Sequence, residues 1–133
     1  MRLIILLSIL LILWSLVVFG QAVPTPAFTD NQAIRACIGE AANQGYQGLL
    51  AVAVGIRNRG SLRGVYGLNS PIVDKQPKWV WDLAKKAWAE SEHNRIHTGT
   101  NWENIKAFGE PSWAKKMVKV YEYKDHIFYK EPK

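Results

Sequence analysis

Cysteine is nearly absent from this chain: Cys37 is the only one among 133 residues. A single cysteine cannot form a disulfide within the chain, so the fold has no covalent cross-link to support its core. It also excludes the paired CxxC motifs of redox proteins and zinc sites. Because Cys37 falls on the apolar face of a predicted helix, we interpret it as structural filler and not as a reactive thiol.

Only one long hydrophobic run is present, over residues 3–19, and it lies at the N-terminus. It follows the basic Met1-Arg2 and precedes the small residues Gly20-Gln21-Ala22, a pattern typical of a cleaved secretory signal peptide over 1–22. The alternative is an uncleaved anchor that attaches the protein to a membrane through residues 3–19. We therefore expect an exported protein in the periplasm, the cell envelope or the extracellular space, and the lack of disulfides favours a bacterial envelope.

Acidic residues are also few, with 11 Asp and Glu against 17 Lys and Arg and a net charge of +6. An exported basic protein concentrates at anionic polymers and lipid headgroups. The basic residues are scattered and do not form a stripe, so nucleic acid is not the expected partner. A simple solubilising role for the charge is the alternative.

Hydrophobic spacing predicts one mainly helical α+β domain over 32–133, after a short linker over 23–31, with a small C-terminal β-hairpin. One segment, Leu49 to Ile56, has no polar face, which is typical of a central buried helix. The predicted elements are helices over 32–43, 49–56 and 77–92, a short helix from Pro111, irregular segments over 61–76 and 94–109, and strands over 118–123 and 126–130.

Glu40 occupies a special place in the first predicted helix. Ile34, Cys37, Ile38 and Ala41 share one apolar face. Glu40 lies about 110° from the centre of that stripe, at about 100° per residue. This position on the margin between core and solvent predicts a carboxyl group that is partly removed from water. An ordinary surface or capping glutamate is the alternative.

Three segments of the chain carry motifs. The first comprises Glu40-Ala41, Tyr46-x-Gly48, Ala51-Val52-Ala53 and Ile56-x-Asn58-Arg59. The second runs from Thr98 to Trp113, and the third is His126-Ile127-Phe128-Tyr129. In sequence and in order, these segments resemble the motifs of the bacterial cell-wall hydrolases of the spore-cortex-lytic-enzyme (SleB) family. Together they span residues 33–130.

The resemblance implies a lysozyme-like fold and an attack on the glycan strands of peptidoglycan, with Glu40 as the catalytic acid. The second motif departs from the family, which often has Gly-Ala-Thr-His-Tyr where this chain has Thr98-Gly99-Thr100-Asn101-Trp102. Asn101 cannot shuttle a proton as histidine can, so the protein is slower or uses another group if that histidine acts in relatives. The loop over 61–76 matches poorly, and no substrate contact is carried over to it.

Cleavage of a glycosidic bond needs an acid for the leaving oxygen and a group that completes the reaction at the sugar carbon. A lytic transglycosylase can do both with Glu40 alone, whereas a hydrolytic muramidase uses a second carboxylate. Glu103 is the best candidate for the second carboxylate, and Asp74 and Glu110 are weaker. If Glu103 faces Glu40 across a cleft, muramidase is the better interpretation. The alternative for Glu103 is a solvated or helix-capping role.

Aromatic faces stack on sugar rings, and amide and hydroxyl groups bond to their substituents. Trp81 and Trp88 lie at helical spacing and are expected in the core. Asn58 and Arg59 either bind N-acetyl or peptide carboxylate groups, or tie the end of their helix to the neighbouring loop. The residues that we expect to bind substrate are Tyr46, Thr100, Asn101, Trp102, His126 and Tyr129.

His93 and His97 are spaced as in a zinc-binding helix, but the motif lacks its glutamate and a third ligand, so we expect no metal and no cofactor. Two other functions compete with glycan cleavage. One is a wall-binding module without activity, which the departure at Asn101 favours. The other is a zinc-dependent N-acetylmuramoyl amidase that cuts the peptide stem. The expected partner is peptidoglycan, and the expected state is a monomer.

Overall fold

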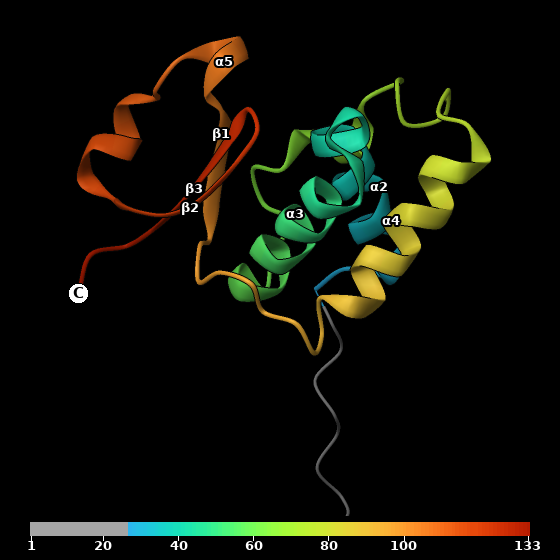
Figure 1. Ribbon diagram of the computed structural model, residues 1–133, viewed down its shortest axis with the longest axis horizontal. Helices are drawn as coiled ribbons and strands as arrows, with labels where there is room; N and C mark the ends of the chain where they lie inside the picture. The colour runs from blue at the N-terminus through green and yellow to red at the C-terminus, as the bar shows by residue number, and fades with distance from the viewer. Residues whose placement is uncertain (1–26) are drawn as a thin grey trace, which may run out of the picture.

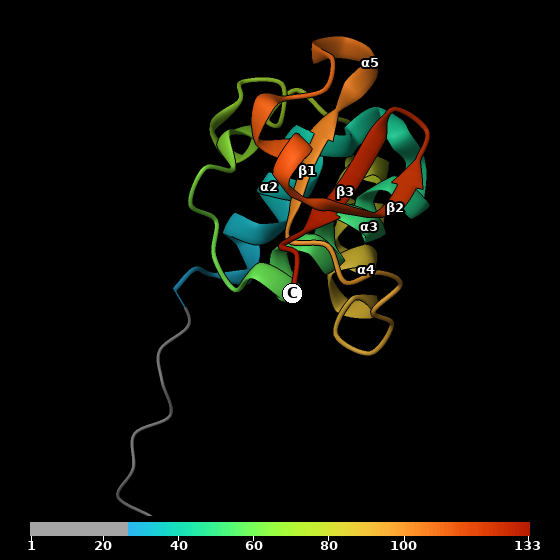
Figure 2. The ribbon, with the colours of Figure 1, turned by 90° about the vertical axis from the view of Figure 1, so that its left-hand side faces the viewer.

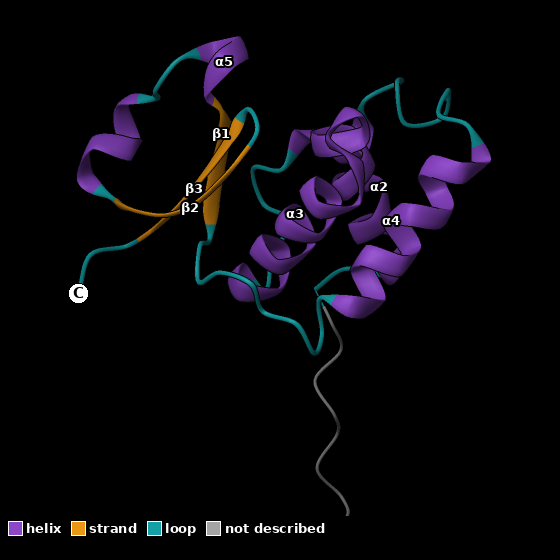
Figure 3. Cartoon of the chain, viewed as in Figure 1, coloured by secondary structure: helices purple, strands orange, loops and turns teal. Residues whose placement is uncertain are grey.

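The computed structural model describes residues 27–133. Within this range the helices α2 (Asp30–Ala41), α3 (Gly45–Arg59) and α4 (Lys78–Glu90) stand beside a three-stranded antiparallel sheet. The sheet lies on one side of α3 and α4 lies on the other (Figures 1 and 3). The predicted signal peptide or anchor over 1–22 falls outside the described residues. From residue 27 onward, no helix has the length and apolar character needed to cross a bilayer.

Helix α3 is the buried centre of the domain, as its apolar sequence predicts. Every residue from Gly48 to Ile56 is buried against α2, α4 or the sheet. The helix begins four residues earlier than predicted, because the chain turns in the short 3-10 helix η1 (Ala42–Gln44) and at Gly45, whose φ is 74°. It ends at Arg59, three residues later than predicted, and Gly60 is its C-cap in the left-handed conformation, with φ 68°.

Helix α2 begins with a capping box. Because of this box, the helix starts two residues before the boundary that we predicted. The Thr29 side chain accepts from the Gln32 N–H, and the Gln32 side chain accepts from the Thr29 N–H. The buried face includes the predicted stripe of Ile34, Cys37, Ile38 and Ala41. Burial raises the pKa of the Cys37 thiol to about 12, which agrees with its role as filler.

Helix α4 packs against both α2 and α3. Pro77 is its N-cap, not its first helical residue, so the helix starts one residue later than predicted and ends at Glu90. Trp88 is buried as expected. Trp81 is only half-buried, and the guanidinium carbon of Arg35 lies 5.9 Å from the centre of its ring.

The predicted C-terminal hairpin is confirmed as strands β2 (Val118–Tyr123) and β3 (His126–Lys130). A third strand, β1 (Asn101–Asn104), pairs with the other edge of β3, so the order is β1-β3-β2 (Figure 2). The expectation of an irregular chain over 94–109 therefore holds over 94–100 and is wrong from Asn101 onward. The sequence Asn-Trp-Glu-Asn lacks the apolar alternation of a strand and pairs because β3 offers a free edge.

Two short helices connect β1 to β2. Helix α5 (Ile105–Phe108) follows β1 directly, and the 3-10 helix η3 (Ser112–Lys116) forms where the sequence predicts a short helix after Pro111. Another 3-10 helix, η2 (Tyr66–Asn69), lies in the loop before α4 and packs against α2. The observed architecture is the mainly helical α+β fold that the sequence predicts, with one strand more than expected.

Buried His97 joins the sheet to α3. Its Nε2 lies 2.7 Å from the Ala51 carbonyl oxygen, and its Nδ1 accepts from the Gly99 N–H at 2.9 Å. The ring centre lies 5.1 Å from that of Tyr121 and 4.5 Å from that of Phe128. These bonds set the position at which the chain enters β1.

Candidate functional site

Glu40 lies one residue before the end of α2 and faces both the loop before α4 and strand β1. Its Oε1 accepts from the Gly67 N–H at 3.2 Å, and its Oε2 accepts from the Trp102 Nε1–H at 3.4 Å. The residue is only partly exposed, on the margin of the core that the helical stripe predicts. Each carboxyl oxygen therefore has one protein donor, and the group still borders an open cleft.

Burial raises the pKa of Glu40 above that of an ordinary glutamate. The charge of Glu103 also raises the pKa, whereas the bonds from Gly67 and Trp102 and the charge of Arg59 lower it. Burial is the largest effect, so the pKa remains raised. A carboxyl group in this environment keeps its proton to a higher pH than an exposed one does, which a general acid requires.

The contact between Gly67 and Glu40 depends on the absence of two side chains. A Cβ added to Gly39 would lie 1.9 Å from the Gly67 carbonyl oxygen. A Cβ added to Gly67 would lie 2.9 Å from Glu40 Oε1. Helix η2 can therefore place its N–H on the acid only because both positions are glycine.

Trp102 reaches Glu40 because Gly55 of α3, which has no side chain, leaves room for the indole ring. A Cβ added to Gly55 would lie 2.9 Å from the indole ring. The ring centre also lies 6.0 Å from that of Phe128, and the guanidinium carbon of Arg59 lies 5.9 Å from the indole centre. The indole is held between helix and sheet with its N–H on the acid.

A cleft opens on both sides of Glu40. One hollow has a volume of about 320 Å³ and the other about 530 Å³, and Glu40 and Glu103 line both of them. The two hollows therefore meet at the acid. Exposed aromatic side chains stand along the cleft: Tyr66 and Trp113 on the smaller side, and Trp79 and Phe108 on the larger side.

Glu103, the second carboxylate candidate, lies in the cleft beside Glu40. It also has a local backbone role, because its Oε1 accepts from the Asn104 N–H at 2.9 Å, and Asn104 caps α5. Of the weaker candidates, Asp74 is exposed and forms an ion pair with Arg35 at 2.7 Å, and Glu110 is exposed. Only Glu103 among the three lines a hollow next to the acid.

Three of the residues that we expect to bind substrate line the cleft: Asn101, Trp102 and His126. Thr100 lies next to them and donates its hydroxyl to Asn101 Oδ1 at 2.9 Å. His126 is buried, and burial lowers its pKa against the opposing effects of Asp125 and the Glu40 backbone carbonyl. It is therefore a neutral imidazole near pH 7.

Tyr46 and Tyr129 line neither hollow at Glu40. Because α3 starts at Gly45, Tyr46 belongs to the first turn of that helix and lies beside Lys86 of α4, whose Nζ is 5.4 Å from the ring centre. Tyr129 is buried, and its ring meets the edge of Trp113 at 5.4 Å between centres. The structure does not bring these two tyrosines to the acid.

Three residues that border the cleft or bond to the acid were not predicted from the sequence: Gly67, Tyr66 and Phe108. Gly67 and Tyr66 lie in the loop over 61–76, where the family motifs match poorly. Phe108 could have been found from the sequence. It is a large aromatic residue beside Gly109 in a polar segment, where no apolar pattern offers it a place in the core. No comparable signal marked the Gly67 N–H.

For Asn58 and Arg59 the alternatives were binding of substrate groups and attachment of the helix end to the neighbouring loop, and the two residues differ in this respect. Asn58 Nδ2 donates to the carbonyl oxygens of His97 and Gly99 at 2.9 and 3.0 Å, so it ties α3 to the chain before β1. Arg59 donates to the carbonyl oxygen of Arg63 and also lines the smaller hollow. Between residues 27 and 133, no three potential metal-binding side chains of His, Cys, Asp or Glu come together.

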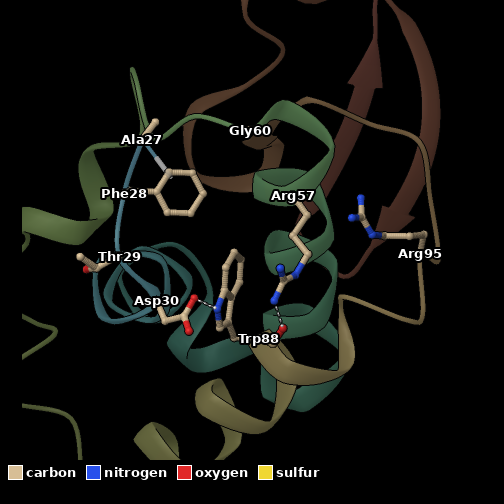
Figure 4. A pocket seen from close by; sticks show the side chains of 8 residues that line it. All are labelled: Ala27, Phe28, Thr29, Asp30, Arg57, Gly60, Trp88 and Arg95. Carbon is tan, nitrogen blue, oxygen red and sulfur yellow. Dashed lines mark hydrogen bonds between the residues drawn. The ribbon is translucent and has the colours of Figure 1, made fainter. Parts of the chain in front are cut away.

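Another hollow, of about 590 Å³, lies away from Glu40 beside Trp88 (Figure 4). Its charged groups are already engaged. Asp30 Oδ1 accepts from the Trp88 indole N–H at 2.9 Å, and Arg57 donates to Ser91 and to the Trp88 carbonyl oxygen while its guanidinium lies 3.7 Å from the Trp88 ring centre. The carboxyl group that lines this hollow, that of Asp30, is thus bonded to the Trp88 indole.

No protein-family description and no curated protein matches this chain. Among solved structures, it is similar to the catalytic domain of the SleB protein of Bacillus cereus, with a TM-score of 0.57 and 23% sequence identity. The match covers 84% of this chain and 99% of that one. It extends over nearly the whole SleB domain, so the chain has the fold that the motif resemblance implies.

Proposed function

We propose that this protein cleaves the glycan strands of peptidoglycan and that Glu40 protonates the bridging oxygen. The observation that carries this proposal is a partly buried carboxyl group with a raised pKa where two hollows meet. Aromatic side chains along both hollows suit a chain of sugar rings. The shared fold with a catalytic domain and the three motifs support peptidoglycan as the substrate class.

In the first step, protonated Glu40 gives its proton to the oxygen between C1 of a muramoyl sugar and the next sugar, and the C1–O bond breaks. The Gly67 and Trp102 N–H groups already bond to the two carboxyl oxygens. They stabilise the carboxylate as it forms, and because they are in place beforehand, little reorganisation is needed. The raised pKa keeps the proton on Glu40 until the substrate takes it.

Our first candidate for the second step is that of a lytic transglycosylase. The Glu40 carboxylate takes the proton of the C6 hydroxyl of the same muramoyl sugar, and the freed oxygen closes on C1. The product is a 1,6-anhydro end, and Glu40 is protonated again. This route needs one carboxylate and no water.

The second candidate is a hydrolytic muramidase, which the position of Glu103 in the same cleft favours. The Glu103 carboxylate takes a proton from water, whose oxygen attacks C1 and leaves an ordinary reducing end. Mass analysis of digested sacculi separates the candidates, because an anhydro end is lighter by one water. Glu103→Gln is expected to abolish hydrolysis but to leave transglycosylation largely intact.

The test of the shared first step is Glu40→Gln, assayed by clearing of purified peptidoglycan. Loss of a general acid lowers the rate by about 10²–10⁴-fold. Glu90→Gln is the matched control, because Glu90 is an exposed glutamate of α4 outside the cleft, and this variant is expected to clear like the wild type. Equal clearing by wild type and Glu40→Gln, or none by either, would contradict an enzyme with Glu40 as its acid.

A further inference from the structure

Arg59, the last residue of α3, extends its side chain into the cleft beside the acid. Its Nη2 donates to the Arg63 carbonyl oxygen, and its guanidinium carbon lies 5.9 Å from the centre of the Trp102 ring. A guanidinium has five N–H donors, and the bond to Arg63 uses one of them. The group is thus held in place at the cleft with donors remaining for a ligand.

Arg59 forms no ion pair with any residue of the described range 27–133, where the pairs are Arg35–Asp74, Lys78–Asp82 and Lys119–Glu122. The residue is only partly exposed, and burial lowers its pKa, while the charge of Glu40 raises it. A cation removed from water without a bonded anion is unfavourable. The charge also lowers the pKa of Glu40, which opposes the first step of the reaction. Without a bonded anion, Arg59 is therefore incompletely neutralised, and its charge disfavours the protonated form of Glu40.

An anionic group on the substrate would offset both effects. It would give the guanidinium its missing partner and neutralise the charge that acts on Glu40. Arginine is suited to this task because its planar fork matches the two oxygens of a carboxylate. Muramoyl sugars carry such groups, either as the free lactyl carboxylate of a peptide-stripped strand or as the carboxylates of an attached peptide stem.

We propose that Arg59 binds a substrate carboxylate next to the bond that Glu40 protonates, so that the smaller hollow selects a muramoyl unit with a free or peptide-borne carboxylate. This inference rests on the proposed function, because it concerns the substrate of the same cleft. It assigns Arg59 to specificity, whereas Glu40 carries the chemistry.

The test compares three forms of one glycan preparation: strands with intact peptide stems, strands stripped to the lactyl carboxylate by an amidase, and stripped strands whose carboxylates are converted to methylamides. The protein variants are the wild type, Arg59→Gln, Arg59→Lys and Arg63→Gln. Arg63→Gln is the matched control, because the Arg63 side chain is exposed and outside the cleft lining, while its carbonyl oxygen is kept. Thermal melts establish that each variant is folded.

We expect Arg59→Gln to raise KM on a carboxylate-bearing form by about tenfold or more, the loss that corresponds to one charge-assisted hydrogen bond. Its KM on methylamide strands should equal that of the wild type. Arg59→Lys should recover part of the affinity, since it restores the charge without the fork. The carboxylate-bearing form that responds, stem-bearing or stripped, identifies the source of the carboxylate. An equal loss on all three forms would overturn the proposal and leave Arg59 with a structural role.

Binding separates this inference from the proposed function. In the Glu40→Gln background no cleavage is needed, and co-sedimentation or calorimetry measures the affinity for each strand form. Weaker binding of the Arg59→Gln double variant to carboxylate-bearing strands alone would support the subsite even if the wild type cleaves no strand. Unchanged binding would overturn the subsite even if Glu40 proves to be the catalytic acid.

Discussion

Burial disfavours the charged form of the Glu40 carboxyl group in the folded protein relative to the unfolded chain, and this raises its pKa. Below the unfolded pKa of about 4.3 both states bind the proton, and the group has no effect on stability. Above it, the folded state retains the proton longer, so stability falls as the pH rises. The acid is therefore held in place at the expense of stability.

We expect Glu40→Gln to be inactive and yet more stable than the wild type at pH 7. The difference in the free energy of unfolding should shrink as the pH falls through the raised pKa of the folded state, and it should vanish below about 4.3, where the side chain is protonated in both states. Urea unfolding at several pH values measures this. A variant that is less stable than the wild type at neutral pH would show that the bonds from Gly67 and Trp102 outweigh burial.

Gly39 provides a second test at the residue scale. In an exposed helix, Gly→Ala stabilises by about 0.5–1 kcal/mol, but here the methyl group meets the Gly67 carbonyl oxygen at 1.9 Å. We expect Gly39→Ala to lose about 1–3 kcal/mol, as in overpacked cores, and to lose activity as the Gly67 N–H moves from Glu40. Chemical unfolding and peptidoglycan clearing measure the two effects. Asn31→Ala, at an exposed position of the same helix, is the control, and full activity of Gly39→Ala would contradict the role of the close contact.

At the scale of elements, the junction between α3 and β1 depends on His97. Burial lowers its pKa, so the folded state favours the neutral ring. Below about pH 6.5 the unfolded chain binds the proton more readily, and stability falls as the pH falls. Protonation would also remove the acceptor for the Gly99 N–H.

We therefore expect the free energy of unfolding to decrease between about pH 7 and pH 5, and His97→Gln to reduce this dependence. The measurement belongs in the Glu40→Gln background, since Glu40 titrates with the opposite sign. Some slope should remain, because burial also lowers the pKa of His126. His93→Gln, at an exposed position, is the control for the histidine-to-glutamine substitution itself. A slope that does not respond to His97→Gln would contradict the role of the buried ring.

The elements differ in how far their sequences define them. Helix α3 is predictable, because only a central helix buries residues on all sides, and its stop at Gly60 follows from local chemistry. Strand β1 is not predictable, because its four residues lack strand alternation and pair with β3. The early start of α3 was missed for a related reason: glycines at 45 and 48 indicate a loop, yet the second is buried in the helix against Gln44 and Tyr123.

At the scale of the whole molecule, the net charge of +6 acts over a longer range than any contact in the cleft. We expect Glu40→Gln to bind anionic peptidoglycan more weakly as salt increases, because the screening length falls from about 10 Å at 0.1 M to about 3 Å at 1 M. Binding to neutral chitin should change much less. Co-sedimentation in a salt series compares the two polymers, and equal salt dependence would contradict a contribution from charge.

The sequence by itself determined the class of fold, the central helix, the C-terminal hairpin and Glu40 as the residue of interest. These features follow from periodicity and capping within one segment, or from motifs that lie in one order along the chain. Only the tertiary structure decided what surrounds the acid: the Gly67 N–H from a loop that matches no motif, the Trp102 indole from an unpredicted strand, and the Arg59 guanidinium. A pKa depends on burial and on charges that arrive from distant segments, so it is set when these segments pack together.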